Sequence, residues 1–384
     1  AVIDAGYRHA RRFLHEDMQA LARQNGSVLS SALFGALAGC GELPFADDAF
    51  EATIQRAGVG VEGSLRTWRA AALAVRQPVR RDAPPDPMAT APRPLPARAA
   101  SPAVEPLRAR IAGEFPHEAQ AMLGAGLQRV LEYQDLAYGT EYLNRVADLH
   151  AHALRCGGAG HGHSATIEAA RWIAVAMSYD DVIRVADLKT RAERQQRVRA
   201  EVGADADAIV GTVEFFHPRL GEIYGLMPRG LADWIERMRP VRAMLVRRIG
   251  NGQRLRPDTV RGQLLLQCLS ALRRWRRRSQ RHGVEMAHVN HWLDTVKNLM
   301  GNDYALAREL ICCRRLVKGY SDTHARGEAK FDKLMQAAVL LNGRPAAATD
   351  LAALRTAALA DPQGQQLAQR WQALGLAALE AAPT

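Results

Sequence analysis

Apolar residues recur at helical spacing along most of this chain, and no convincing strand-like alternation interrupts them. Alanine and leucine dominate and runs of β-branched residues are few, which also favours helix over strand. The pattern predicts helices at 106–113, 116–136, 139–155, 165–178, 179–202, 205–216, 219–225, 229–247, 257–281, 284–300, 303–317 and 325–342. We therefore expect a mainly α protein with an all-helical C-terminal domain.

Shorter helical patterns come before this domain. They predict helices at 4–24, at 28–40, from Asp47 to Arg56, and at 61–76. The 28–40 segment is small and apolar on nearly every side, which is typical of a helix buried between two layers.

Composition divides the chain into four parts. Residues 77–105 are rich in Pro and Ala and lack a hydrophobic period, which indicates an extended linker. This linker separates residues 1–76 from the helical domain at 106–344. The Ala-rich tail at 345–384 predicts one weak helix near 363–379.

The chain is basic, with a net charge of +11, and arginine supplies nearly all of this charge. Such a charge favours an acidic partner or ligand, although the excess of Arg, Ala and Gly is also typical of a GC-rich genome. Because lysine is rare here, our hypothesis is that some lysine sites need a compact ammonium group. The lysines are Lys189, Lys297, Lys318, Lys330 and Lys333.

Several classes of protein are disfavoured. No apolar stretch approaches the ~20 residues of a membrane-spanning helix, and the five scattered cysteines favour a reducing compartment over a disulfide framework. We therefore expect a soluble, cytoplasmic protein. The sequence has no CxxCxxC cluster motif, Walker loop, GxSxG elbow or HExxH motif, so we expect its chemistry to be shared with another polypeptide.

A weak metal candidate lies near residue 156. Its four residues, His152, Cys156, His161 and His163, could together form a tetrahedral zinc site, but their spacing matches no established zinc motif. The neighbouring His150 falls on an apolar stripe and is expected in the core.

Two further patterns are weaker. Glu285 and His288 form one Glu-x-x-His, and because a di-iron bundle needs two copies, we expect a surface helix face there. Six arginines between 273 and 281 surround Trp275, which could bind nucleic acid. No recognised nucleic-acid motif accompanies them, so solvation or an acidic neighbour is the favoured interpretation.

Two segments, 177–190 and 315–327, are unusually rich in reactive side chains. In the first, Ser178 and Asp181 are typical of a variant capping box, and Arg184 and Lys189 follow on the same helix. These two cations form one of two sets of candidate residues for binding an anion.

In the second segment, Gly319 should end one helix, and the polar residues 321–323 can cap the next. The turn would place Lys318, Tyr320, His324 and Arg326 beside a helix N-terminus, which suits an anion. The alternative is a polar turn that only fixes packing.

The same segments carry a family resemblance. NGSVLSSALFGALAGCGELPFADDAFEATI and GVGVEGSLRTW resemble the end of the gamma-type domain of 2-oxoacid:ferredoxin oxidoreductases. AMSYDDVIRVADLKTRAER, FFHPRLGEI and CRRLVKGYSDTHARGEAKFDKLM resemble the helical extension in the beta subunit of bacterial indolepyruvate:ferredoxin oxidoreductases. The resemblance covers most of residues 1–342. It implies a helical domain that follows the last helices of an α/β domain, whose glycine-rich opening strand, turn and helix are not in this sequence.

The resemblance implies oxidative decarboxylation of an aryl 2-oxoacid such as indolepyruvate to an acyl-coenzyme A, with ferredoxin as acceptor. Thiamine diphosphate and the 4Fe-4S clusters would lie on a partner alpha subunit, so this chain would be inactive alone and would hold no catalytic residue or cofactor. Coenzyme A carries phosphates, so the two candidate segments could meet it. The alternatives are a purely structural scaffold or lid of that complex, and a nucleic-acid-binding helical protein.

Overall fold

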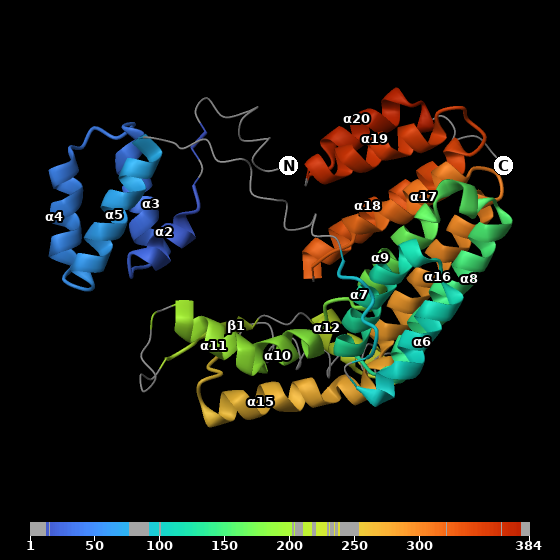
Figure 1. The fold of residues 1–384 in the computed structure, drawn as a ribbon, viewed down its shortest axis with the longest axis horizontal. Helices are drawn as coiled ribbons and strands as arrows, with labels where there is room; N and C mark the ends of the chain where they lie inside the picture. The colour runs from blue at the N-terminus through green and yellow to red at the C-terminus, as the bar shows by residue number, and fades with distance from the viewer. Residues whose placement is uncertain are drawn as a thin grey trace. The chain divides into compact units, whose positions relative to one another are not determined.

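The chain folds mainly into α-helices, as the sequence pattern predicts (Figure 1). The computed structural model describes residues 13–76 except 15, 92–201 except 100, and 253–377 except 320 and 362. Between 201 and 253 it describes residues 203, 210–216, 220–228, 230, 234, 237 and 238. Two compact units are present: residues 1–90 with 190–212, and residues 91–189 with 213–384.

The first unit contains α2 (Met18–Gln24), α3 (Leu29–Cys40), α4 (Asp47–Ala57), α5 (Val61–Arg76) and α11 (Ala192–Glu201). Helix α3 approaches α5 closely because Gly35 has no side chain: a Cβ there would lie 2.3 Å from the Trp68 carbonyl oxygen. The opposite side of α3, which carries Leu29, Leu33 and Leu37, is 45–50% exposed. The expectation that this helix is covered on both sides is therefore not met within the described residues.

The helices of the second unit are α6 (Glu105–Glu114), α7 (His117–Tyr133), α8 (Leu136–Arg155), α9 (Ser164–Met177), α10 (Val182–Thr190), α12 (Leu220–Leu226), α15 (Val260–Ala271), α16 (Gln280–Met300), α17 (Tyr304–Cys313), α18 (Ser321–Leu341), α19 (Ala347–Ala360) and α20 (Gln365–Ala373). Four short 3-10 helices accompany them among the described residues: η1 (Pro102–Val104), η2 (Gly158–His161), η3 (Leu272–Arg278) and η4 (Arg314–Leu316). Strands β1 (Glu214–Phe216) and β2 (Gln253–Leu255) pair antiparallel.

One apolar core runs through the second unit, and it reaches from α6 to α20. Tyr142 and Trp292 are fully buried in it. Leu354 of α19 and Trp371 of α20 belong to the same core. The weak single helix expected in the Ala-rich tail is therefore corrected to two helices: α19 packs against α17 and α18, and α20 packs against α19.

Several predicted helices have different bounds. The 179–202 helix is interrupted at Arg191, and the 257–281 helix starts at Val260 and passes into η3. The predicted helix at 205–216 is wrong at its end, where residues 214–216 form β1 and pair with β2. The paired residues are thirty-seven or more positions apart in sequence, so local periodicity does not reveal this partner. Most of the predicted 229–247 helix, and residues 4–12 and 15 of the predicted 4–24 helix, lie outside the described residues.

No helix among the described residues combines the length and the apolar character needed to cross a bilayer.

Candidate functional site

The two segments that the sequence singled out meet at one pocket in the second unit. The pocket has a volume of about 120 Å³, enough for a carboxylate or phosphate group. Its walls come from α7, the end of α9 and the residues after it, η4 and the turn that follows, and α18. The lining residues are Arg129, Val175, Ala176, Ser178, Tyr179, Asp180, Arg314, Val317, Lys318, Gly319 and His324. We call this the 178–324 pocket.

Local backbone signals shape both walls. Gly319 has a φ of 74°, in the left-handed region that glycine tolerates, and the chain turns there before α18 begins. On the other wall, α9 ends at Met177, and the Asp181 carboxylate accepts a 2.6 Å hydrogen bond from the Arg184 N–H at the start of α10. The predicted capping role of Ser178 is therefore wrong: Asp181 caps α10 instead.

The pocket is basic. Three cations, Arg129, Arg314 and Lys318, line it with one carboxylate, Asp180, whose pKa is raised by burial. Ser178 is 6% exposed, and its hydroxyl has no hydrogen-bond partner among the described residues. Charge and an unpaired hydroxyl donor both favour an anionic ligand.

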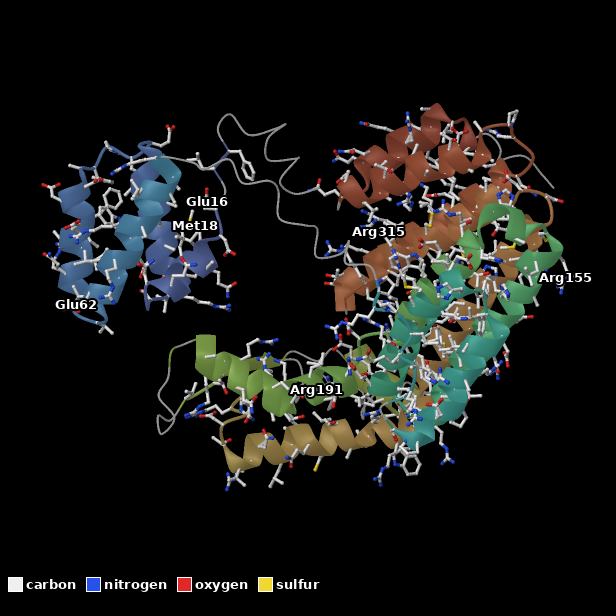
Figure 2. All side chains as sticks on the ribbon, in the orientation of Figure 1. Glu16, Met18, Glu62, Arg155, Arg191 and Arg315 are labelled. Carbon is white, nitrogen blue, oxygen red and sulfur yellow. The ribbon has the colours of Figure 1, made fainter. Side chains whose placement is uncertain are left out.

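Arg314 is held rigidly at the pocket wall. It is 1% exposed, whereas the next residue, Arg315, is exposed to solvent (Figure 2). Its Nη1 donates a 2.8 Å hydrogen bond to His288 Nδ1, and its guanidinium lies 5.5 Å from the Trp292 ring centre and 5.2 Å from that of Phe331. Burial lowers the pKa of Arg314, and the nearby Glu285 carboxylate opposes this effect.

His324 forms the pocket wall beside Arg314 and is 4% exposed. Arg281 Nη2 lies 3.2 Å from its Nδ1, and Glu285 Oε1 lies 3.4 Å from its Nε2. Burial lowers the pKa of His324 to about 4, and the charge of Arg281 acts in the same direction. The ring is therefore neutral at neutral pH. Glu285 is 2% exposed, so the surface position expected for the Glu285/His288 pair is wrong for Glu285.

Acidification should destabilise the second unit through His324. His324 becomes protonated near pH 4 in the folded protein and near pH 6.5 in the unfolded chain. Its contribution to stability is therefore complete above pH 6.5 and is lost as the pH falls toward 4. Urea unfolding across this window should show a smaller loss in His324→Gln than in the unsubstituted protein. His291→Gln, at an exposed site on α16, is the control. An equal loss of stability in all three proteins would show that His324 is not the group responsible.

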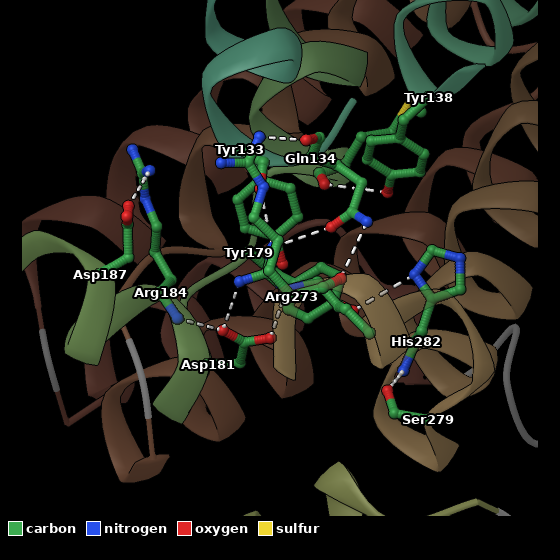
Figure 3. A network of polar contacts seen from close by, with 12 residues as sticks. Tyr133, Gln134, Tyr138, Tyr179, Asp181, Arg184, Asp187, Arg273, Ser279 and His282 are labelled. Carbon is green, nitrogen blue, oxygen red and sulfur yellow. Dashed lines mark hydrogen bonds and ion pairs between the residues drawn. The ribbon is translucent and has the colours of Figure 1, made fainter. Parts of the chain in front are cut away.

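A second buried network positions the 178–184 wall (Figure 3). Arg276 is 2% exposed and binds both carboxylate oxygens of Asp181, at 2.8 and 3.1 Å. Its Nη1 also donates to the Tyr133 carbonyl at 2.7 Å, and its guanidinium lies 4.0 Å from the Tyr133 ring centre. Tyr179 and His282 continue the network, with 3.3 Å between the hydroxyl and Nδ1.

The network explains much of the arginine run around Trp275. Besides Arg276, Arg273 donates to the Leu131 and Gln134 carbonyls, and Arg277 binds Glu141 at 2.7 Å. These arginines therefore connect helices of the fold, in agreement with the acidic-neighbour interpretation.

The structure separates the predicted anion-binding residues. Lys318 and His324 line the 178–324 pocket. Arg184 and Lys189 do not line it, and the Arg184 guanidinium binds Asp187 at 3.2 Å. Arg326 is exposed and donates to the Asp322 carbonyl. The remaining predicted residue, Tyr320, lies outside the described residues.

Three of the lysines have structural roles. Lys297 binds Asp148 and Asp294, each at 3.1 Å. Lys330 donates to two carbonyls at the end of α19, and Lys333 lies 4.7 Å from the Trp371 ring centre. Lys318 is the lysine that lines the 178–324 pocket.

The weak zinc candidate does not assemble. His161 stacks on Tyr304 with 4.3 Å between ring centres, and His152 lies 3.2 Å from Arg155. Within the part of the chain that the structure describes, no three His, Cys, Asp or Glu side chains gather in an arrangement that could hold a metal ion. His150 is buried and hydrogen bonded to Thr166 at 2.9 Å, so the core position predicted for it is confirmed.

Sequence reasoning missed two cations of the pocket. Arg129 lies on α7, far from both segments in sequence, and no local pattern marks it. Arg314 directly precedes the 315–327 segment, and the sequence alone does not distinguish this buried arginine from the exposed Arg315 beside it. A helical-spacing argument could have placed Arg314 on the same face as Leu310 and Ile311, which are buried.

One protein family matches this chain, over residues 119–337, a range that includes every residue of the 178–324 pocket. Searches of curated proteins and of solved structures gave no match. Because the family match covers more than half of its residues, the chain belongs to the family of unknown function DUF6537.

Proposed function

We propose that the 178–324 pocket binds an anionic group and that this chain is the helical, cofactor-free part of an aryl-2-oxoacid:ferredoxin oxidoreductase that works in the cytoplasm. The observation that carries the proposal is the position of the two segments with the strongest family resemblance. They lie far apart in sequence, yet they form facing walls of one basic pocket.

The pocket's chemistry supports this proposal. Arg314 and Lys318 supply charge, and Ser178 supplies a hydroxyl without a partner among the described residues. A volume of about 120 Å³ suits one phosphate or carboxylate group of a larger ligand. The substrate 2-oxoacid and the phosphates of coenzyme A are the candidates that the resemblance offers. Thiamine diphosphate, the 4Fe-4S clusters and ferredoxin docking belong to the partner subunit in this proposal.

Substituting Lys318 should weaken anion binding. Because a hydrogen bond to a charged group contributes about 1.5–3 kcal/mol, Lys318→Ala should lower the affinity for coenzyme A by roughly 10- to 100-fold. Titration calorimetry of the full chain and the apparent KM of the complex measure this effect. Lys318→Arg tests whether a compact ammonium is required.

Arg326→Ala is the matched control, since Arg326 lies seven residues after Gly319 but outside the pocket. Its affinity for coenzyme A should stay unchanged. If Lys318→Ala behaves like Arg326→Ala, the pocket does not bind this ligand, and the scaffold alternative is favoured. Co-purification of a brown, thiamine-containing partner tests the assignment to the complex separately.

The nucleic-acid alternative loses three of the six arginines that supported it. Arg273, Arg276 and Arg277 contact backbone carbonyls or carboxylates within the unit, so they are not available to a phosphate backbone.

A further inference from the structure

Helix α15 is apolar on two opposite sides. On one side, Leu266 is fully buried and packs with Ala186 of α10. On the other side, Val260 is 77% exposed and Leu264 is 53% exposed. Apolar side chains on two opposite sides are typical of a helix that is covered on both of them.

The exposed side continues into η3. Val260, Leu264, Cys268 and Leu272 recur every four residues, and Trp275, which is 57% exposed, extends the row. We call these five residues the α15 stripe. Isolated exposed apolar side chains are ordinary, but a contiguous row marks an interaction surface.

A pocket lies at the C-terminal end of the stripe. Its volume is about 350 Å³, and Met227, Pro228, Leu272, Trp275 and Arg278 contribute to its lining. The wall is fixed in place because the Gln280 N–H donates a 2.9 Å hydrogen bond to the Met227 carbonyl. A concave apolar pocket of this kind accepts a protruding large side chain.

The segment that carries the stripe is basic. The sequence from 259 to 284 contains no Asp or Glu. Arg261, Arg274 and Arg278 are exposed and bind no carboxylate among the described residues. An occupant that complements this surface must present an apolar row flanked by acidic groups.

We infer that the α15 stripe is the docking site for an acidic amphipathic helix of another protein, which inserts a large apolar side chain beside Trp275. The apolar side chains of α15 recur at the spacing with which a docked helix presents its own apolar side chains, and the pocket beside Trp275 receives the large side chain of that helix. A second copy of this chain fits less well, because pairing the same surface would bring the same arginines together. A flat lipid surface would leave the concave pocket unfilled. This inference does not depend on the 178–324 pocket.

Two designed helical peptides test the inference on the full chain. Both carry Leu and Trp on one face; one has Glu on its flanks, and the other has Lys. By fluorescence anisotropy, the Glu peptide should bind at least about tenfold more tightly than the Lys peptide. Leu264→Asp and Trp275→Ala should each weaken binding of the Glu peptide by about tenfold or more.

Leu154→Asp is the control, since Leu154 is 45% exposed on α8, away from the stripe. Circular dichroism confirms that the variants fold. Equal binding of both peptides, no binding of either, or full binding to Leu264→Asp would overturn the inference. Concentration-dependent self-association that Leu264→Asp abolishes would also overturn it, in favour of a second copy. Binding to anionic phosphatidylserine vesicles that the same variant abolishes would overturn it in favour of a membrane.

Discussion

Arg276→Ala is expected to destabilise the second unit by about 3–5 kcal/mol, because it leaves the Asp181 carboxylate without its buried partner. Arg276 is 2% exposed and Asp181 is 7% exposed, so water cannot replace the lost hydrogen bonds without local opening. The substitution also removes the donor to the Tyr133 carbonyl. Urea unfolding followed by far-ultraviolet circular dichroism measures the loss.

Two comparisons make this prediction specific. Arg274→Ala, at an exposed neighbouring position, should change stability by less than about 0.5 kcal/mol. The double variant Arg276→Met with Asp181→Leu should recover much of the loss, because two apolar side chains leave no buried charge unpaired. If Arg276→Ala unfolds like Arg274→Ala, the buried ion pair does not stabilise the fold.

Trp292→Ala should have an effect of similar size. Trp292 is fully buried, and its ring lies 6.1 Å from that of Phe331 at a near-perpendicular angle. Removing a buried tryptophan leaves a large cavity in a closely packed core and costs about 3–5 kcal/mol. Thermal and urea unfolding measure this loss.

Trp275→Ala is the control, since Trp275 is 57% exposed and its removal opens no cavity. A loss of stability equal to that of Trp292→Ala would contradict the different burial of the two side chains. Trp292 also packs on the Arg314 guanidinium, so Trp292→Ala should weaken anion binding at the 178–324 pocket as well. A destabilised variant with unchanged anion affinity would show that Arg314 keeps its position without the ring.

The two buried arginines connect stability with the proposed site. Arg276 fixes the wall that contains Tyr179 and Asp180 through its ion pair with Asp181. Arg314 forms part of the opposite wall. Anchoring both walls through buried ion pairs or ring contacts keeps the pocket preorganised, which lowers the entropic cost of binding.

The amino-acid sequence alone determined the helical class, the position of most helices and the two segments that form the pocket. Helical periodicity and turn residues such as Gly319 act within a few positions along the chain, so they can be recognised without a fold. The burial of His150 was also predictable, because its apolar neighbours recur at helical spacing.

Only the tertiary structure decided which of many arginines are buried and which cations share a pocket. Arg129, Arg314 and Lys318 come from separate elements, and their convergence depends on how the helices pack. Likewise, Asp181 and Arg276 are 95 positions apart, so no local pattern could pair them. Periodicity identifies the face of a helix, whereas the partner of that face is set by long-range packing.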